Sequence, residues 1–263
     1  MNEVLLSLFL GLIQGLTEFL PISSSAHLLF PTLLFGTDDL GLAFDIAVHA
    51  GTLFAVMYFF RADISLMIMS LVSKHNDQKD NRKLAYLLII ATIPIVIAGL
   101  FGSDLIELNR NNISNIAYMN LLFAGFLLFA YKISASSKSL IELTVASAVF
   151  IGIFQVFALF PGASRSGTAI TAALLIGLNL KDSSKFAFLL AIPTIFGALV
   201  FLIGDMVLYE SKINIISLVI GFFSSSIVAF LTIKYFLIFV EKIGMYPFVI
   251  YRVLLGLLIL ILI

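Results

Sequence analysis

The chain contains 263 residues, of which 61% are hydrophobic and 11% charged, and its mean hydropathy is +1.15. Soluble domains carry about 25% charged residues, so this composition indicates an integral membrane protein and excludes a separate soluble domain. Lys and Arg together number 15, as do Asp and Glu, which excludes a basic surface for nucleic acid. The chain has no cysteine, so any metal must be held by oxygen or histidine.

Six apolar runs are long enough to cross a bilayer, which takes about 20 residues in a helix. In chain order they are Leu42–Phe60, Leu84–Phe101, Ile113–Tyr131, Phe186–Gly204, Ile213–Ile233 and Tyr246–Ile263. We expect an all-α polytopic membrane protein with these six transmembrane helices.

Two further apolar stretches are interrupted by proline and small polar residues. The first is Val4–Leu20 followed by Ser25–Phe35, across the segment PISSS, and the second is Leu140–Phe160 followed by Ser166–Leu178, across PGASRSG. Proline removes a backbone donor and disfavours helix in the residue before it. Non-helical backbone at membrane depth is tolerated only where protein buries it or where it lines a cavity. We therefore expect two re-entrant helix hairpins whose tips meet inside the protein.

The two interrupted stretches also resemble each other. Shifting Gly11–Ser25 by 141 positions produces five identities in fifteen, namely Gly11 with Gly152, Gln14 with Gln155, Phe19 with Phe160, Ser23 with Ser164, and Ser25 with Ser166. Each half would hold one hairpin and three crossings, an odd number, so the second half must be inverted. The sequence thus predicts inverted repeats over 1–132 and 138–263 within one membrane domain, an arrangement typical of transporters.

Positive charge predicts the orientation, because cytoplasmic loops are enriched in Lys and Arg. One face receives eleven basic residues: Arg61, Lys74, Lys79, Arg82, Lys83, Lys132, Lys138, Lys181, Lys185, Lys234 and Lys242. The other face receives only Arg110 and Lys212. We expect the first face to be cytoplasmic and both termini to lie outside. Arg252 is expected to snorkel at the cytoplasmic end of the last span, which leaves Arg165 as the one deep cation.

Glu18 and Arg165 are the charges that most need an explanation, since a charge at the bilayer centre costs roughly 2.5–3.5 kcal/mol. Gln14 lies four residues before Glu18, on the same helical face. A carboxylate and an amide oxygen on one face suit a hard divalent cation such as Mg²⁺ or Ca²⁺. Two structural alternatives remain: a polar contact between helices for Gln14 and Glu18, and a plain Glu18–Arg165 ion pair.

The segment PISSSAH places Ser23, Ser24, Ser25 and His27 where a second helix piece begins. A serine at such a position is first of all a helix cap. Three hydroxyls and a histidine beside a buried carboxylate also offer a nucleophile and a proton-transfer group.

In the second half, PGASRSGT supplies a comparable turn with Gly162, Ser164, Arg165, Ser166 and Thr168. A glycine-containing turn that leads into a helix N-terminus presents backbone N–H groups, and a guanidinium adds a bidentate donor. These are the parts of a phosphate-binding site.

Asp45 and His49 are four residues apart in the first full span. They suit either a second layer of the site or a polar contact near the outer end of that span, and we favour the polar contact.

The two motifs resemble those of the undecaprenyl-diphosphatase family of bacterial membrane proteins, the type associated with bacitracin resistance. QGLTEFLPISSSAH is similar to the family's first signature, with Glu or Gln four residues before Glu and then Pro-x-Ser-Ser, and PGASRSGT is similar to the second. The resemblance implies hydrolysis of undecaprenyl diphosphate to undecaprenyl phosphate, which recycles the lipid carrier of cell-wall synthesis. It further implies a multi-pass protein of the bacterial plasma membrane with its active site open to the outer face.

Carried over by position, the resemblance makes Glu18 and Gln14 metal-site residues, Ser24 the candidate nucleophile, His27 a proton-transfer residue and Arg165 the phosphate clamp. Many family members have Glu at position 14, where this chain has Gln, so its site has one negative charge fewer. The nucleophile is left open between Ser24 and a water activated by the metal. The alternative function is an inverted-repeat transporter or lipid flippase with Glu18 and His27 as a proton relay; a scaffold would leave the buried charges unexplained.

Overall fold

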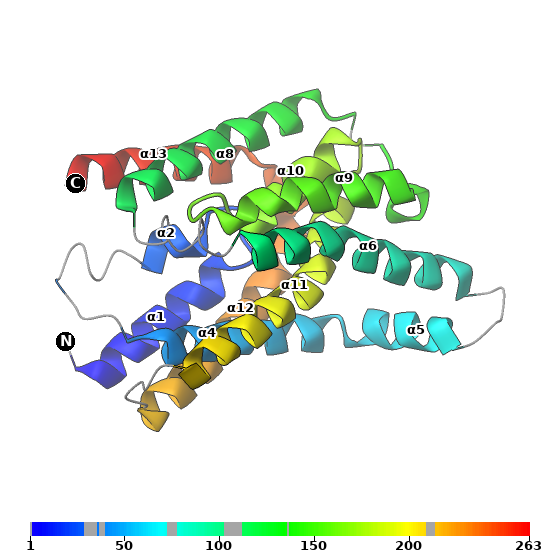
Figure 1. Ribbon diagram of the computed structural model, residues 1–263. Helices are drawn as coiled ribbons and strands as arrows, with labels where there is room; N and C mark the ends of the chain where they lie inside the picture. Colours follow the sequence, from blue (N-terminus) through cyan, green and yellow to red (C-terminus); the bar gives the residue numbers. More distant parts are fainter. Residues whose placement is uncertain are drawn as a thin grey trace.

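The computed structural model describes residues 2–28, 36, 40–72, 78–102, 112–135, 137–208 and 214–263, and it is helical throughout these ranges apart from turns and one isolated bridge between Lys138 and Leu178. Figure 1 shows the helices gathered into a single bundle, with both termini at the same end. The elements are α1 (Glu3–Thr17), α2 (Ser24–Leu28), α4 (Leu42–Phe59), α5 (Arg61–Val72), α6 (Lys79–Phe101), α8 (Ile113–Ile133), η2 (Leu140–Glu142), α9 (Val145–Gln155), η3 (Val156–Leu159), α10 (Arg165–Leu175), α11 (Leu180–Leu208), α12 (Ile215–Ile243) and α13 (Tyr246–Leu262).

Helices of membrane-spanning length confirm the polytopic class. Within the described residues, five helices are long and apolar enough to cross a bilayer: α4, α6, α8, α11 and α12. The sixth predicted span corresponds to α13, which has 17 residues. The structure also contains one helix that the sequence did not predict, because α5 continues the chain directly after α4 where a cytoplasmic loop was expected.

Both predicted interruptions are present as breaks between helices. α1 ends at Thr17 and α2 begins at Ser24, while α9 and the short η3 end at Leu159 and α10 begins at Arg165. Residues 29–35, which belong to the predicted second piece of the first hairpin, lie outside the described residues. In Figure 1, α1 enters the bundle from the end at which both termini lie, and α9 enters from the opposite end.

The two halves pack against each other crosswise. α1 packs on α12 and α9 packs on α6, while α4 packs on both α11 and α12. Two glycines allow α1 to approach α12 closely and α9 to approach α6 closely. A Cβ on Gly11 would collide with Ser224 of α12, and a Cβ on Gly152 would lie 2.5 Å from the carbonyl oxygen of Ala91 on α6. Small residues at membrane helix interfaces let the backbones approach in this way.

Basic residues collect at the end of the bundle opposite the termini. Lys83 Nζ donates to Ile141 O at 2.6 Å, and Lys185 Nζ pairs with Asp63 Oδ1 at 2.6 Å. These contacts join the start of α6 to η2 and the start of α11 to α5, so several of the segments that the charge count assigned to one face do lie together. Lys74, Arg110 and Lys212 lie outside the described residues.

Candidate active site

Glu18 is the centre of a buried polar cluster between the two breaks. Its residue is 8% exposed. Oε2 accepts hydrogen bonds from Gln14 Nε2 and from Ser24 Oγ, both at 2.9 Å, and Oε1 accepts from Arg165 Nη2 at 3.0 Å. The i, i+4 spacing on α1 brings Gln14 to the carboxylate. Ser24 and Arg165, the first residues of α2 and α10, reach Glu18 from the two breaks.

Two buried atoms of this cluster have no partner among the described residues. They are Oε1 of Gln14 and Nη1 of Arg165, an acceptor and a charged donor. An unsatisfied buried polar group costs about 1–3 kcal/mol, and more when charged. Arg165 also lies over the ring of Phe19, 5.7 Å from its centre. The cluster is thus held in place on one side and retains an unused cationic donor and an unused amide oxygen for a ligand.

The two breaks have the same local geometry. Ser23 and Ser164, which the 141-residue shift pairs, both have φ = 71°, the left-handed conformation that L-residues seldom adopt. Ser23 Oγ lies 3.0 Å from Ser25 Oγ, and Ser164 Oγ lies 3.2 Å from Ser166 Oγ. Such backbone strain persists only where its surroundings hold it.

Serine hydroxyls tie one break to the other. Ser25 Oγ accepts from Gly162 N at 3.1 Å, and Ser166 Oγ donates to Leu20 O at 2.8 Å. Ser164 caps α10 by accepting from Gly167 N, as predicted for a serine at a helix start, and Thr168 Oγ1 donates to Arg165 O. The predicted contact of these residues with a ligand stays a prediction, because the bonds that the structure gives them lie within the protein.

Arg252 corrects the sequence analysis. We expected it to snorkel toward water, but it is fully buried. Its Nη1 donates to Pro21 O at 3.4 Å and its Nη2 to Gly162 O at 2.9 Å and Ala163 O at 3.1 Å. The 141-residue shift pairs Pro21 with Gly162, so one guanidinium binds equivalent carbonyls of both breaks.

Asn120 of α8 fixes Arg252 from the other side. Arg252 Nε donates to Asn120 Oδ1 at 2.9 Å, and Asn120 Nδ2 donates to Arg252 O at 2.7 Å. Neither residue was singled out from the sequence as part of a site. A buried charge that needs a partner is the signal that could have identified Arg252, provided that the depth of its position on α13 had been known.

His27 is buried and oriented by two hydrogen bonds. Nδ1 lies 2.7 Å from Ser23 O, and because a carbonyl only accepts, Nδ1 carries a proton. Nε2 lies 2.7 Å from the hydroxyl of Tyr251, whose ring stacks on the imidazole with the ring centres 5.5 Å apart. The sequence analysis did not identify Tyr251 as a partner of His27.

His49 lies beside the carboxylate, a contact that the interpretation we favoured for the Asp45–His49 pair did not include. Its Nε2 is 4.0 Å from Glu18 Oε2, and its Nδ1 lies 2.8 Å from Asp45 O. The side chain of His49 is 30% exposed. It is therefore an imidazole at the edge of the cluster that is accessible from outside the protein core.

The sequence model of the family described as "Bacitracin resistance protein BacA" matches residues 7–258. The chain belongs to this family. Members of the BacA family that it resembles are named undecaprenyl-diphosphatase in three bacteria. It is 46% identical to that of Saccharophagus degradans over 97% of this chain and 96% of the relative, and 44% identical to those of Alcanivorax borkumensis and Teredinibacter turnerae, in each case over 95% of both chains.

The residues of this BacA family member fit a divalent cation only in part. Among the described residues, no group of three or more His, Asp and Glu side chains is placed to hold an ion. Glu18 accepts three hydrogen bonds and retains one of about four lone-pair positions, and Gln14 Oε1 is unpartnered. Hard oxygen donors of this kind suit Mg²⁺ or Ca²⁺, and Mg²⁺ is commonly held by one or two protein groups together with substrate phosphates. These donors thus fit a cation whose remaining coordination positions are filled by a phosphorylated ligand.

Proposed function

We propose that the protein hydrolyses undecaprenyl diphosphate to undecaprenyl phosphate and inorganic phosphate. Family membership and the names of the relatives support this reaction. The observation that carries the proposal in this chain is the unpartnered Nη1 of Arg165, a buried cationic donor fixed beside Ser24 and Glu18. Diphosphate hydrolysis needs charge stabilisation on phosphoryl oxygens and a placed nucleophile, and these side chains supply both.

Arg165 would bind the diphosphate through its free Nη1 while Nη2 stays on Glu18. Since the guanidinium fork is planar and rigid, the Glu18 contact also sets the direction in which Nη1 points. Glu18 and Gln14 Oε1 would hold a divalent cation against the same diphosphate. When bound, such a cation neutralises phosphoryl charge and lowers the barrier to cleavage of the anhydride bond.

The Ser24–Glu18 hydrogen bond orients a hydroxyl at the site. Either Ser24 Oγ attacks the terminal phosphorus and passes its proton to Glu18, with water then releasing the phosphate, or Ser24 holds an attacking water. In both routes the P–O bond of the anhydride breaks, undecaprenyl phosphate leaves and one water is consumed. His27 and His49 are the candidates for the remaining proton transfers, and His49 Nε2 lies 4.0 Å from Glu18 Oε2.

An apolar groove supplies a place for the polyprenyl chain. It has a volume of about 380 Å³ and lies between the end of α1, the outer face of α12 and the start of α13. Its lining includes Leu16, Leu20, Leu231, Phe236 and Phe248. Leu20 belongs to the first break, where its carbonyl accepts from Ser166, so the groove begins next to the polar cluster.

We further infer a plasma-membrane protein of two inverted repeats, with six spans that include α13, two re-entrant hairpins and a site open to the outer face. The crosswise packing, the matched φ angles of Ser23 and Ser164, and the binding of Pro21 and Gly162 by Arg252 support the repeat. The gathering of basic residues at the end away from the termini supports the orientation.

Phosphate release from a detergent-solubilised polyprenyl diphosphate tests the function. A hydrolase needs no sealed membrane, so we expect release from the purified protein in detergent. The competing transporter function predicts no release in detergent and movement of a polyprenyl phosphate only in sealed vesicles. The names of the relatives favour the hydrolase, and absence of release with divalent cation present would refute it.

A further inference from the structure

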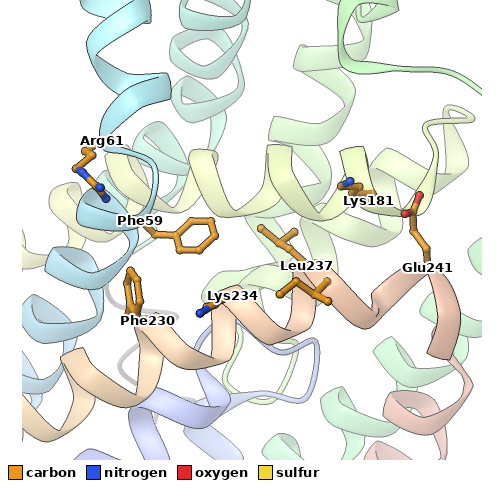
Figure 2. Close-up of a pocket in the computed structure, with 8 residues that line it drawn as sticks. Phe59, Arg61, Lys181, Phe230, Lys234, Leu237 and Glu241 are labelled. Carbon is orange, nitrogen blue, oxygen red and sulfur yellow. The ribbon is translucent and has the colours of Figure 1, made fainter.

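A second, separate cavity lies at the basic end of the bundle. Its volume is about 500 Å³, and it is open to the surface between the α4–α5 junction, the start of α11 and the C-terminal half of α12. Figure 2 shows Arg61, Lys181 and Lys234 around this space, one from each of these elements. Glu241 of α12 also lines it. The four charges leave the lining with a net charge of +2.

Within the described part of the chain, none of the three cations forms an ion pair. Among the described residues, no carboxylate oxygen lies within 4.0 Å of Arg61, Lys181 or Lys234, whereas the nearby Lys185 is paired with Asp63 at 2.6 Å. Arg61 donates to Tyr58 O at 2.9 Å and lies over the Tyr58 ring, and Lys234 lies over the ring of Tyr235. These neighbours position the cations without cancelling their charge.

The rest of the lining is apolar. Phe59 and Phe230 meet edge to face with ring centres 5.7 Å apart, and Leu237 and Ile238 continue the wall along α12. The cavity therefore combines a cationic rim with an aromatic and aliphatic wall. Tyr58 and Tyr235, beside it, are about half exposed, and tyrosine in a membrane protein concentrates at the level of the lipid head groups.

We propose that this cavity, defined by Arg61, Lys181, Lys234, Phe59 and Phe230, binds the head group of an anionic phospholipid from the cytoplasmic leaflet. The cations match the phosphodiester charge and the apolar wall matches the glycerol and the first methylenes of an acyl chain. Basic pockets between transmembrane helices on the cytoplasmic side bind anionic lipids in this manner. The leaflet rests on the orientation proposed above, but the binding itself does not.

Lipid binding to the purified protein tests the proposal without measuring hydrolysis. Phosphatidylglycerol and phosphatidylcholine are titrated separately, by native mass spectrometry, against the wild type and a triple variant, Arg61→Gln with Lys181→Gln and Lys234→Gln. The control variant, Lys79→Gln with Lys132→Gln and Lys242→Gln, removes three exposed cations outside the cavity. Each cation near an anionic lipid adds about fivefold to affinity, so we expect the cavity variant to bind phosphatidylglycerol at least about tenfold more weakly.

Measurements on the control variant and with phosphatidylcholine can each overturn the proposal. Equal weakening in both variants, or equal binding of both lipids, would mean general surface attraction and would overturn the proposal. If inorganic phosphate displaces the lipid at the concentrations at which the lipid itself binds, the cavity is a site for a soluble phosphate ligand. That result would also overturn the proposal. If the triple variant melts well below the wild type without added lipid, the single variant Lys234→Gln replaces it, with Lys242→Gln as its control. An unchanged affinity of Lys234→Gln for phosphatidylglycerol then counts against the site.

Discussion

Glu18 is bound by three side chains, and among the described residues its carboxylate is the only acceptor of the Ser24 hydroxyl. We predict that Glu18→Gln abolishes phosphate release, because the substitution removes the negative charge that orients Arg165 and that holds the cation in the proposed mechanism. The variant should still fold, since Gln is nearly isosteric, with a lowered melting temperature because the buried guanidinium loses its partner. Phosphate release is measured over a series of divalent-cation concentrations.

Two comparisons accompany that measurement. A chelator should abolish the activity of the wild type, and Gln14→Glu should retain activity because it adds an oxygen donor at the same position. Near-normal turnover of Glu18→Gln at saturating cation would show that the metal assignment is wrong.

Arg165→Lys distinguishes a phosphate clamp from a structural ion pair. Lysine keeps the charge and the attraction to Glu18, but it cannot bind Glu18 and a phosphate through one planar fork. We predict a loss of about 10²–10³ in turnover, typical for a lost transition-state donor, with little change in melting temperature. Turnover and melting are measured in the same detergent, and an active but destabilised variant would refute the clamp.

Arg252 is expected to act at a distance from the chemistry. Replacing it in Arg252→Gln leaves carbonyls of Pro21, Gly162 and Ala163 unpaired, and each buried unpaired group costs about 1–3 kcal/mol. We predict a markedly lower melting temperature together with reduced turnover, because the two breaks lose the guanidinium that binds carbonyls of both. Arg61→Gln, which removes an exposed arginine, serves as the control, and its melting temperature without added lipid should equal that of the wild type.

Most of the residues that the sequence identified have local chemistry, and Arg165 is the exception, identified because a deep charge needs an explanation. Gln14 and Glu18 are one helical turn apart, and Ser24 lies beside a proline break, so spacing alone brought them together. Arg252 and His49 reach the cluster from other helices. Their contribution depends on how α13 and α4 pack and at what depth, and a hydropathy pattern does not contain that information.

At the level of the helices, the close contact at Gly152 predicts that the melting temperature is sensitive to one methyl group added there. Gly152→Ala would place its Cβ 2.5 Å from Ala91 O, a backbone atom that moves only with α6, whereas a Cβ on Gly125 of α8 meets nothing within 4 Å. We predict that Gly152→Ala lowers the melting temperature, while Gly125→Ala leaves it unchanged or raises it because Ala favours helix by about 0.8–1.0 kcal/mol over Gly. Equal melting of the two variants would contradict the close packing of α9 on α6.

The helix boundaries show where apolar patterning is and is not sufficient. The predicted spans agree with α4 and α8, because apolar length defines them. α12 runs on from Ile233 to Ile243, α11 begins at Leu180 rather than Phe186, and α6 begins at Lys79 rather than Leu84. In all three cases the added turns contain lysines, which end a hydrophobic run but favour helix as well as most residues do. α5 was missed for the same reason, since Arg61 and Asp63 interrupt the apolar pattern but not the helix.

For the whole molecule, the orientation is tested with single cysteines in a chain that has none of its own. We predict that cysteines at positions 79 and 138 are protected in intact cells from a reagent that does not cross membranes, and that cysteines at positions 2 and 212 react. Permeabilised cells provide the control, since all four positions should react there. Reaction at 79 together with protection at 212 would reverse the orientation and place the site on the inner face.

The proposed internal repeat concerns the whole chain, and five identities predicted it. The structure gives physical reasons for several of them: Gly11 and Gly152 allow close packing, and Ser23 and Ser164 adopt the same left-handed turn. The Gln14–Gln155 match has no such explanation, as both side-chain polar atoms of Gln155 are buried and unpartnered among the described residues. Sequence similarity could not reveal that an arginine outside both motifs binds carbonyls of both breaks.

The position of Arg252 in the chain sets the order in which the site is assembled during synthesis. α13 follows every other element of the polar cluster, so both breaks have left the ribosome before the guanidinium that joins their carbonyls is available. Until then, Pro21 and Gly162 lack the partner that they share in the finished protein, and the serine hydroxyls and the Glu18–Arg165 pair join the two breaks. The last buried cation of the cluster therefore arrives late, with the docking of α13 against α8.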